Sequence, residues 1–194
     1  MLKDVRNHEM NKNQLFILSY QTCQWWNAVF IQANRFFDVL EEDHGGTPWD
    51  NSNANSLFIA ERMFLIVAIH HAIEDLEKLK IERQRIGDDS IKPVLQAIEA
   101  VAPLEDIKNL RDMNEHNLDY LVKKGRKQSE YSTVVNKNGF EILTTAAWTH
   151  VNGDAKMVLL GNVEIDKLLI VMKQQLPTVQ AITKEIFENG LLGE

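Results

Sequence analysis

Residues 14–43, QLFILSYQTCQWWNAVFIQANRFFDVLEED, decide the fold. The stretch contains no glycine or proline, and side chains suited to a core recur at spacings of three, four or seven residues, as on one helix face. These residues are Leu15, Leu18, Thr22, Trp25, Val29, Phe36 and Leu40, and a second line consists of Phe16, Tyr20, Cys23, Phe30 and Phe37. A stripe this wide predicts a long amphipathic helix that has neighbours on more than one side, at the centre of a bundle.

A second helix is predicted for about residues 55–84. Residues 44–55 collect glycines, a proline and small polar side chains, and this turn chemistry separates the two helices. Apolar residues in the second helix again recur at helical spacing: Ile59, Met63, Ile66, Ile69, Ile73 and Leu76. The glycine and polar residues at positions 87–90 then end the pattern.

Two further helices follow before the pattern changes. Ser90 is a suitable N-cap for a short third helix, which carries Pro93 in its first turn. Pro103 ends that helix and begins a fourth, predicted to run to about Lys124. Glu105 and Asp106 would lie in its first turn, where the helix dipole favours negative charge.

The sequence then becomes typical of strands. Residues 131–135, 140–151 and 155–160 are rich in β-branched and aromatic side chains, and Asn-Gly pairs at 138–139 and 152–153 separate them. Because Asn-Gly favours tight hairpin turns, we predict a three-stranded antiparallel β-meander over about residues 130–160. A last helix is predicted from about Val163 to Asn189.

We therefore expect the chain to form one domain. Its 194 residues show no repeat of fixed period and no low-complexity tract, and three strands alone have little core. We predict a mainly α-helical domain over residues 1–194, a bundle of about five helices with the meander inserted before the last one. We also expect a homodimer formed through the long helices.

Composition restricts the cellular setting and the partners. Cys23 is the single cysteine, and the first residues contain no apolar signal segment, so a cytoplasmic location is expected. The longest apolar run, residues 63–69, is far shorter than the ~20 residues that span a bilayer, which predicts no membrane association. The net charge of -7 argues against non-specific coating of nucleic acid, and no DNA-binding signature is present.

One short motif indicates chemistry. In RDMNEH, residues 111–116, an arginine and a histidine have four residues between them on the predicted fourth helix. This arrangement resembles the Arg-x4-His motif of the HEPN superfamily, helical-bundle domains whose members include metal-independent ribonucleases. A polar residue often follows the arginine in that family, as Asp112 does here. Leu118 stands where many members have a tyrosine, two residues after the histidine.

These residue types suit the cleavage of RNA. A 2'-hydroxyl that attacks the neighbouring phosphate must lose a proton while the leaving oxygen gains one, and histidine titrates near neutral pH. A guanidinium is always charged and matches two phosphate oxygens at once. We therefore assign His116 as general acid/base and Arg111 as phosphate clamp. Asp112, four residues before His116, would orient the imidazole.

Helix geometry adds a condition to this hypothesis. Positions five apart lie about 140° apart around the axis, so Arg111 and His116 do not share a face unless they lie at a helix end or kink. The family resemblance implies a composite site, formed with the same motif of a second chain. Tyr120, four residues after His116, would line the substrate pocket. Lys123, Lys124 and Arg126 would steer an RNA backbone, or would merely offset the helix dipole.

Two other functions stay open. The chain can be a non-catalytic adaptor or regulatory bundle that binds a protein or small ligand, with Arg111 in an ordinary ion pair with Glu115. A metal-dependent hydrolase is the third interpretation, since His71 and Asp75 share a helix face. No second pair of this kind completes a coordination shell, so neither a metal nor another cofactor is predicted.

Overall fold

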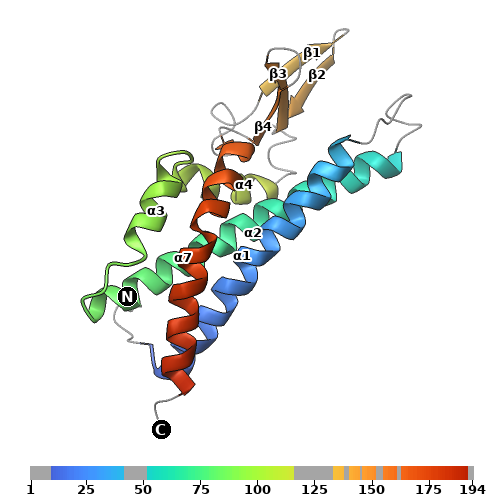
Figure 1. Cartoon of the computed structure of the whole chain (residues 1–194). Helices are drawn as coiled ribbons and strands as arrows, with labels where there is room; N and C mark the ends of the chain where they lie inside the picture. The colour runs from blue at the N-terminus through green and yellow to red at the C-terminus, as the bar shows by residue number, and fades with distance from the viewer. Residues whose placement is uncertain are drawn as a thin grey trace, which may run out of the picture.

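A computed structural model describes residues 10–41, 52–115, 133–137, 140–144, 146–151, 155–160 and 163–191. Within these ranges the chain is mainly helical, as predicted, and forms five helices (Figure 1). They are α1 (Lys12–Glu41), α2 (Ser52–Arg85), α3 (Lys92–Glu99), α4 (Leu104–Glu115) and α7 (Ile165–Leu191). None of these helices is both long enough and apolar enough to cross a membrane.

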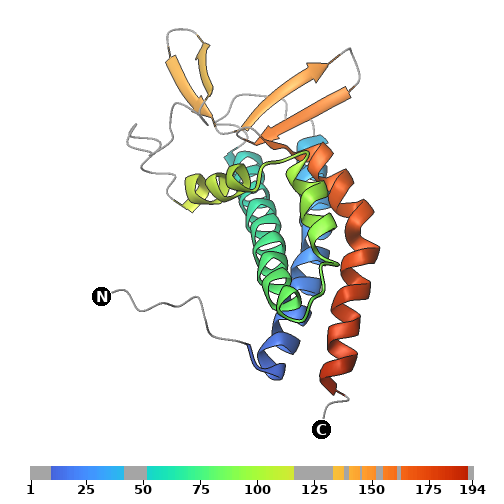
Figure 2. The same cartoon turned by 90° about the vertical axis from the view of Figure 1, so that its left-hand side faces the viewer.

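The two long helices form the frame of the bundle. Helices α1 and α2 run antiparallel along most of their length, and α7 packs against α1 (Figures 1 and 2). Helix α3 lies against α7, and α4 lies across α2. The largest fully buried side chains come from α1, α2, α7 and the short α3 region: Val29, Trp26, Phe36, Leu65, Leu76, Leu79, Ile91, Ile98, Ile165, Leu168 and Met172.

Specific polar contacts hold the long helices to their neighbours. The indole Nε1 of Trp26, on α1, donates a hydrogen bond to the carbonyl of Met172 on α7, at 3.3 Å. Arg35 Nη2 lies 2.7 Å from Oε1 of the buried Glu61, which joins α1 to α2. A buried polar group without a partner costs free energy, so these bonds fix the relative positions of the three helices as well as stabilise them.

Capping residues explain where the long helices begin and end. At the start of α1, Asn11 and Gln14 exchange hydrogen bonds between side chain and backbone, at 3.0 and 2.9 Å, which is a capping box. At the end of α2, the Gly87 N–H bonds the carbonyl of Gln84 and the Asp88 N–H bonds that of Arg83. This is a Schellman motif, and Gly87 has the positive φ of +80° that it requires.

Helix α3 begins differently from the prediction. Ile91, rather than Ser90, occupies the N-cap position. The Ser90 N–H instead donates to Oδ1 of Asp88 at 2.7 Å, so the serine belongs to the turn that closes α2. The acidic first turn predicted for α4 is confirmed, with Glu105 and Asp106 at the expected places.

The predicted single meander of three strands is wrong. The structure contains β1 (Thr133–Lys137), β2 (Phe140–Thr144), β3 (Ala146–Val151), β4 (Ala155–Leu160) and β5 (Val163–Glu164). The stretch predicted as one strand, residues 140–151, is divided between β2 and β3. Strand β2 pairs with β1 in one sheet, whereas β3 pairs with β4, and β4 with β5, in another. Strand β2 pairs with the strand before it and β3 with the strand after it. Both pairs are hairpins of strands adjacent in sequence, which short turns can connect.

The strands lie at one end of the bundle. Both sheets sit beyond the N-terminal end of α7, away from the C-terminus (Figure 2). Strand β5 leads directly into α7, which begins at Ile165 rather than at the predicted Val163. Val163 and Ile165 are both fully buried, so this junction is anchored in the core.

Candidate functional site

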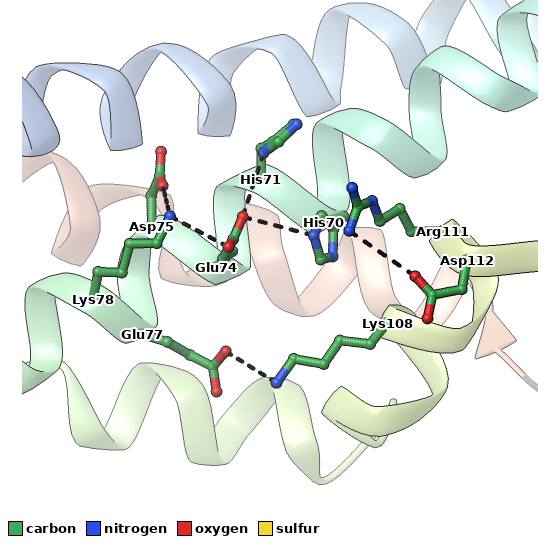
Figure 3. A network of polar contacts seen from close by, with 9 residues as sticks. All are labelled: His70, His71, Glu74, Asp75, Glu77, Lys78, Lys108, Arg111 and Asp112. Carbon is green, nitrogen blue, oxygen red and sulfur yellow. Dashed lines mark hydrogen bonds and ion pairs between the residues drawn. The ribbon is translucent and has the colours of Figure 1, made fainter. Parts of the chain in front are cut away.

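A pocket of about 500 Å³ opens between α2 and α4. Helix α2 supplies residues at helical spacing along one face, and α4 supplies three more from one face. The lining residues are His70, Glu74, Glu77, Lys78 and Ile81 from α2, and Lys108, Arg111 and Asp112 from α4. Figure 3 shows all of them except Ile81. Since α4 crosses α2 at this point, polar side chains far apart in the sequence converge on one surface.

His70 is the most buried titratable residue that lines the pocket, with 7 % of its surface exposed. Its Nε2 lies 3.7 Å from Oε2 of Glu74, one turn along α2. Burial lowers the pKa of His70, and Arg111 and His71 lower it further. Glu74 and Asp112 act in the opposite direction, but the net shift is downward. A neutral imidazole can accept a proton, so His70 has the protonation state of a general base.

Glu74 is shared by three basic side chains. Besides His70, its carboxylate faces His71 Nδ1 at 3.6 Å and Lys78 Nζ at 3.3 Å. Partial burial raises the pKa of Glu74, but Lys78 and the two histidines outweigh that effect and leave the pKa below its ordinary value. Glu74 is therefore a carboxylate at neutral pH and can hold the position of His70.

His71 points to a different environment. Its ring stacks on Trp25 of α1, with centroids 4.7 Å apart, and it does not line the pocket. Asp75, its predicted companion in a metal site, instead accepts a hydrogen bond from Lys78 Nζ at 3.1 Å. Among the residues that the structure describes, no group of three or more histidine, cysteine or carboxylate side chains is arranged to hold a metal ion.

The two lysines of the pocket are held by carboxylates. Burial lowers the pKa of Lys78, but its hydrogen bond to Asp75 and its ion pairs with Asp75 and Glu74 raise it above its ordinary value. Lys108 of α4 reaches across to Glu77 of α2, with Nζ and Oε2 3.6 Å apart. The Lys108–Glu77 ion pair ties α4 to α2, and the carboxylates balance most of the positive charge of the pocket.

Arg111 lies next to His70. Its guanidinium occupies the space between His70 and Asp112 in Figure 3, and Nη1 is 3.9 Å from Oδ1 of Asp112. The Arg111 side chain is 36 % exposed and that of Asp112 is 62 % exposed, so both reach the solvent-facing part of the pocket. A guanidinium with five N–H donors in this place can bind a phosphate or carboxylate group beside a neutral imidazole.

Two of the residues predicted from the motif, Arg111 and Asp112, thus line one pocket. The predicted histidine of that motif, His116, and the predicted substrate-binding residues Tyr120, Lys123, Lys124 and Arg126 lie outside the described residues. The motif does not include His70, because it contains only residues close in sequence to Arg111. The available signal was a histidine among apolar residues of α2, with Glu74 one turn away.

This pocket is the strongest candidate for a functional site in the described part of the chain. Comparisons with protein-family models, with curated proteins and with solved structures found no match to this chain.

Proposed function

We propose that this protein is a HEPN-like helical-bundle domain that binds RNA and cleaves it without a metal ion, as a homodimer. The observation that carries the proposal is the position of Arg111, partly exposed in a pocket of about 500 Å³ and adjacent to a buried histidine. Phosphodiester transfer requires a positively charged group that binds the phosphate, here the guanidinium of Arg111, beside a group that accepts a proton, here the histidine.

The proposed reaction uses no metal ion or other cofactor. The 2'-oxygen of the RNA forms a bond to phosphorus as the bond to the 5'-oxygen breaks, which gives a 2',3'-cyclic phosphate and a free 5'-hydroxyl. Arg111 binds the phosphate oxygens, on which negative charge accumulates in the transition state. His116 transfers protons as general acid/base, and Asp112 orients it. Tyr120, Lys123, Lys124 and Arg126 contact the substrate.

The homodimer belongs to the same proposal. Large apolar side chains are exposed on the two long helices, among them Ile17, Tyr20 and Ile31 on α1 and Phe64 on α2. Exposed apolar side chains in such numbers favour a protein partner, and a second copy would complete the composite site that the family resemblance implies.

The direct test is cleavage of a mixed RNA pool in EDTA by wild type, Arg111→Ala, Arg111→Lys and His116→Ala. We expect wild type to cut, Arg111→Ala to lose about 10²–10³-fold in rate, and Arg111→Lys to lose less, because lysine keeps the charge without the paired contact. Arg85→Lys is the matched control, since Arg85 ends α2 outside the pocket. Absence of cutting by folded wild type, or equal cutting by all variants, contradicts the proposal.

A non-catalytic adaptor or regulatory role is the second candidate. The observation in its favour is the charge balance of the pocket, where Lys78, Lys108 and Arg111 face Glu74, Glu77 and Asp112. A balanced pocket attracts RNA less strongly than a basic groove does. The same experiment separates the two functions, because an adaptor leaves the RNA intact whichever residue is changed.

A further inference from the structure

We propose that His70 is a second catalytic histidine of this site, acting as the general base, and that Glu74 is its positioning residue. The inference rests on the proposed ribonuclease function and adds a proton acceptor from α2, outside the Arg-x4-His motif. The juxtaposition of His70, Glu74 and Arg111 in one pocket carries it (Figure 3).

The chemistry leaves room for two histidines. One proton leaves the 2'-hydroxyl and another reaches the 5'-oxygen, on opposite sides of the phosphorus, so one imidazole in one place serves both transfers poorly. Neutral His70 takes the 2'-hydroxyl proton as the 2'-oxygen attacks. Protonated His116 gives its proton to the departing 5'-oxygen. The proton count then balances, and no further reactant is needed.

Glu74 determines which nitrogen of His70 is available. The carboxylate lies near Nε2, so it favours the tautomer that carries its proton on Nε2, and the other ring nitrogen, Nδ1, keeps its lone pair. Their separation of 3.7 Å is longer than a hydrogen bond, and catalytic hydrogen bonds often shorten only when substrate is bound. Once His70 is protonated, the same carboxylate stabilises the imidazolium.

Arg111 links substrate binding to the basicity of His70. Among the described residues, the charged or titratable groups that face His70 are Glu74 and His71 on α2 and Arg111 and Asp112 on α4. Burial is the main reason why the pKa of His70 is lowered in the free protein, and Arg111 lowers it further because it disfavours a second positive charge beside it. A phosphate bound to Arg111 neutralises that charge and makes His70 a stronger base. The base therefore strengthens when the substrate arrives.

The test compares the pH dependence of kcat/KM for wild type, His70→Gln and Glu74→Gln, with His71→Gln as the matched control. His71 adjoins His70 on α2 and also faces Glu74, but it does not line the pocket. We expect the rate of His70→Gln to be about 10²–10⁴-fold lower than that of wild type. Its pH profile should also lack the acidic limb, because that limb reports the deprotonation of the base. Glu74→Gln should move the acidic limb to lower pH. His71→Gln should keep the rate of wild type, with the acidic limb at slightly higher pH, because His71 no longer lowers the pKa of His70.

A measurement on unaltered protein covers the case in which His70→Gln does not fold. The His70 ring proton is followed by NMR against pH, alone and with a non-cleavable oligonucleotide that has deoxyribose at the scissile position. We expect the pKa of His70 to rise when the oligonucleotide binds, and not to rise in Arg111→Gln. An unchanged pKa at saturation overturns the inference.

The outcomes also separate this inference from the proposed function. If wild type cuts RNA and folded His70→Gln cuts with the same rate and profile, the ribonuclease stands and the role of His70 is wrong. If folded wild type does not cut, both are wrong.

Discussion

The guanidinium of Arg83, near the end of α2, donates two hydrogen bonds to the carboxylate of Glu185 on α7. They run from Nη1 to Oε1 and from Nη2 to Oε2, each at 3.2 Å. The same guanidinium forms an ion pair with Asp88, in the turn that follows α2. The Arg83 side chain is 10 % exposed, whereas that of Glu185 is 54 % exposed. One nearly buried side chain therefore joins the ends of two helices to the turn between α2 and α3.

Arg83→Ala should be considerably more destabilising than Glu185→Gln. The alanine variant loses both ion pairs and the packing of the arginine stem, an expected cost of about 2–3 kcal/mol. Glu185→Gln leaves Arg83 paired with Asp88, and an ion pair this exposed contributes only about 0.5–1 kcal/mol. Urea unfolding measures both, with Lys184→Ala as the control at an exposed ion pair on α7. Equal losses from the two variants would show that Arg83 has no role beyond Glu185.

Gly87→Ala should cost about 1 kcal/mol of unfolding free energy, entirely through the backbone. Gly87 has φ +80°, and a Cβ at this position would meet no atom within 4 Å, so no clash contributes. Gly87→Asn should cost less, because asparagine tolerates left-handed backbone better than alanine does. Equilibrium unfolding in urea checks the order glycine, asparagine, alanine. An alanine variant as stable as wild type would mean that the Schellman turn does not limit stability.

Trp26→Phe should destabilise the bundle by about 2–3 kcal/mol, because it removes a buried donor and leaves a cavity. Trp26 is fully buried, and its indole reaches the Met172 carbonyl on α7. Trp25→Phe is the matched control, since Trp25 is only partly buried and stacks on His71. Thermal unfolding followed by circular dichroism gives both values. If Trp25→Phe costs as much as Trp26→Phe, the bond from α1 to α7 is not an important contact.

The helices could be predicted from the sequence because their signals are local. The apolar spacing of residues 14–43 and the break at Gly87 lie within a few turns of the elements they define. The start of α1 is two residues earlier than predicted, at Lys12, because the apolar stripe does not include its polar capping box, Asn11 and Gln14. Periodicity marks the buried part of a helix, whereas caps mark its ends.

The sheet topology and the pocket depend on relationships that spacing does not contain. Residues 140–151 have strand character throughout, and only the choice of partners divides them between β2 and β3. His70 and Arg111 meet because α4 crosses α2, a packing arrangement set by core residues such as Ile107 and Leu110. Arg111 could be singled out from its own helix. His70 lies on another helix, and only the tertiary structure places it beside Arg111.

His70 should make the protein less stable as pH falls through the range just below 6.5. Burial lowers the pKa of His70 from its ordinary value of 6.5, so the unfolded chain binds this proton more readily than the folded one. The stability is fully present above pH 6.5 and is lost as pH falls through the lower folded pKa. Glu74, whose pKa is also lowered, acts below its ordinary value of 4.5 and therefore outside this range. Melting temperatures from pH 7.5 to 5.0 should fall more steeply for wild type and His71→Gln than for His70→Gln. The four histidines other than His70 and His71 are common to all three proteins. Parallel curves would therefore mean that His70 takes up its proton equally well in the folded and unfolded chain.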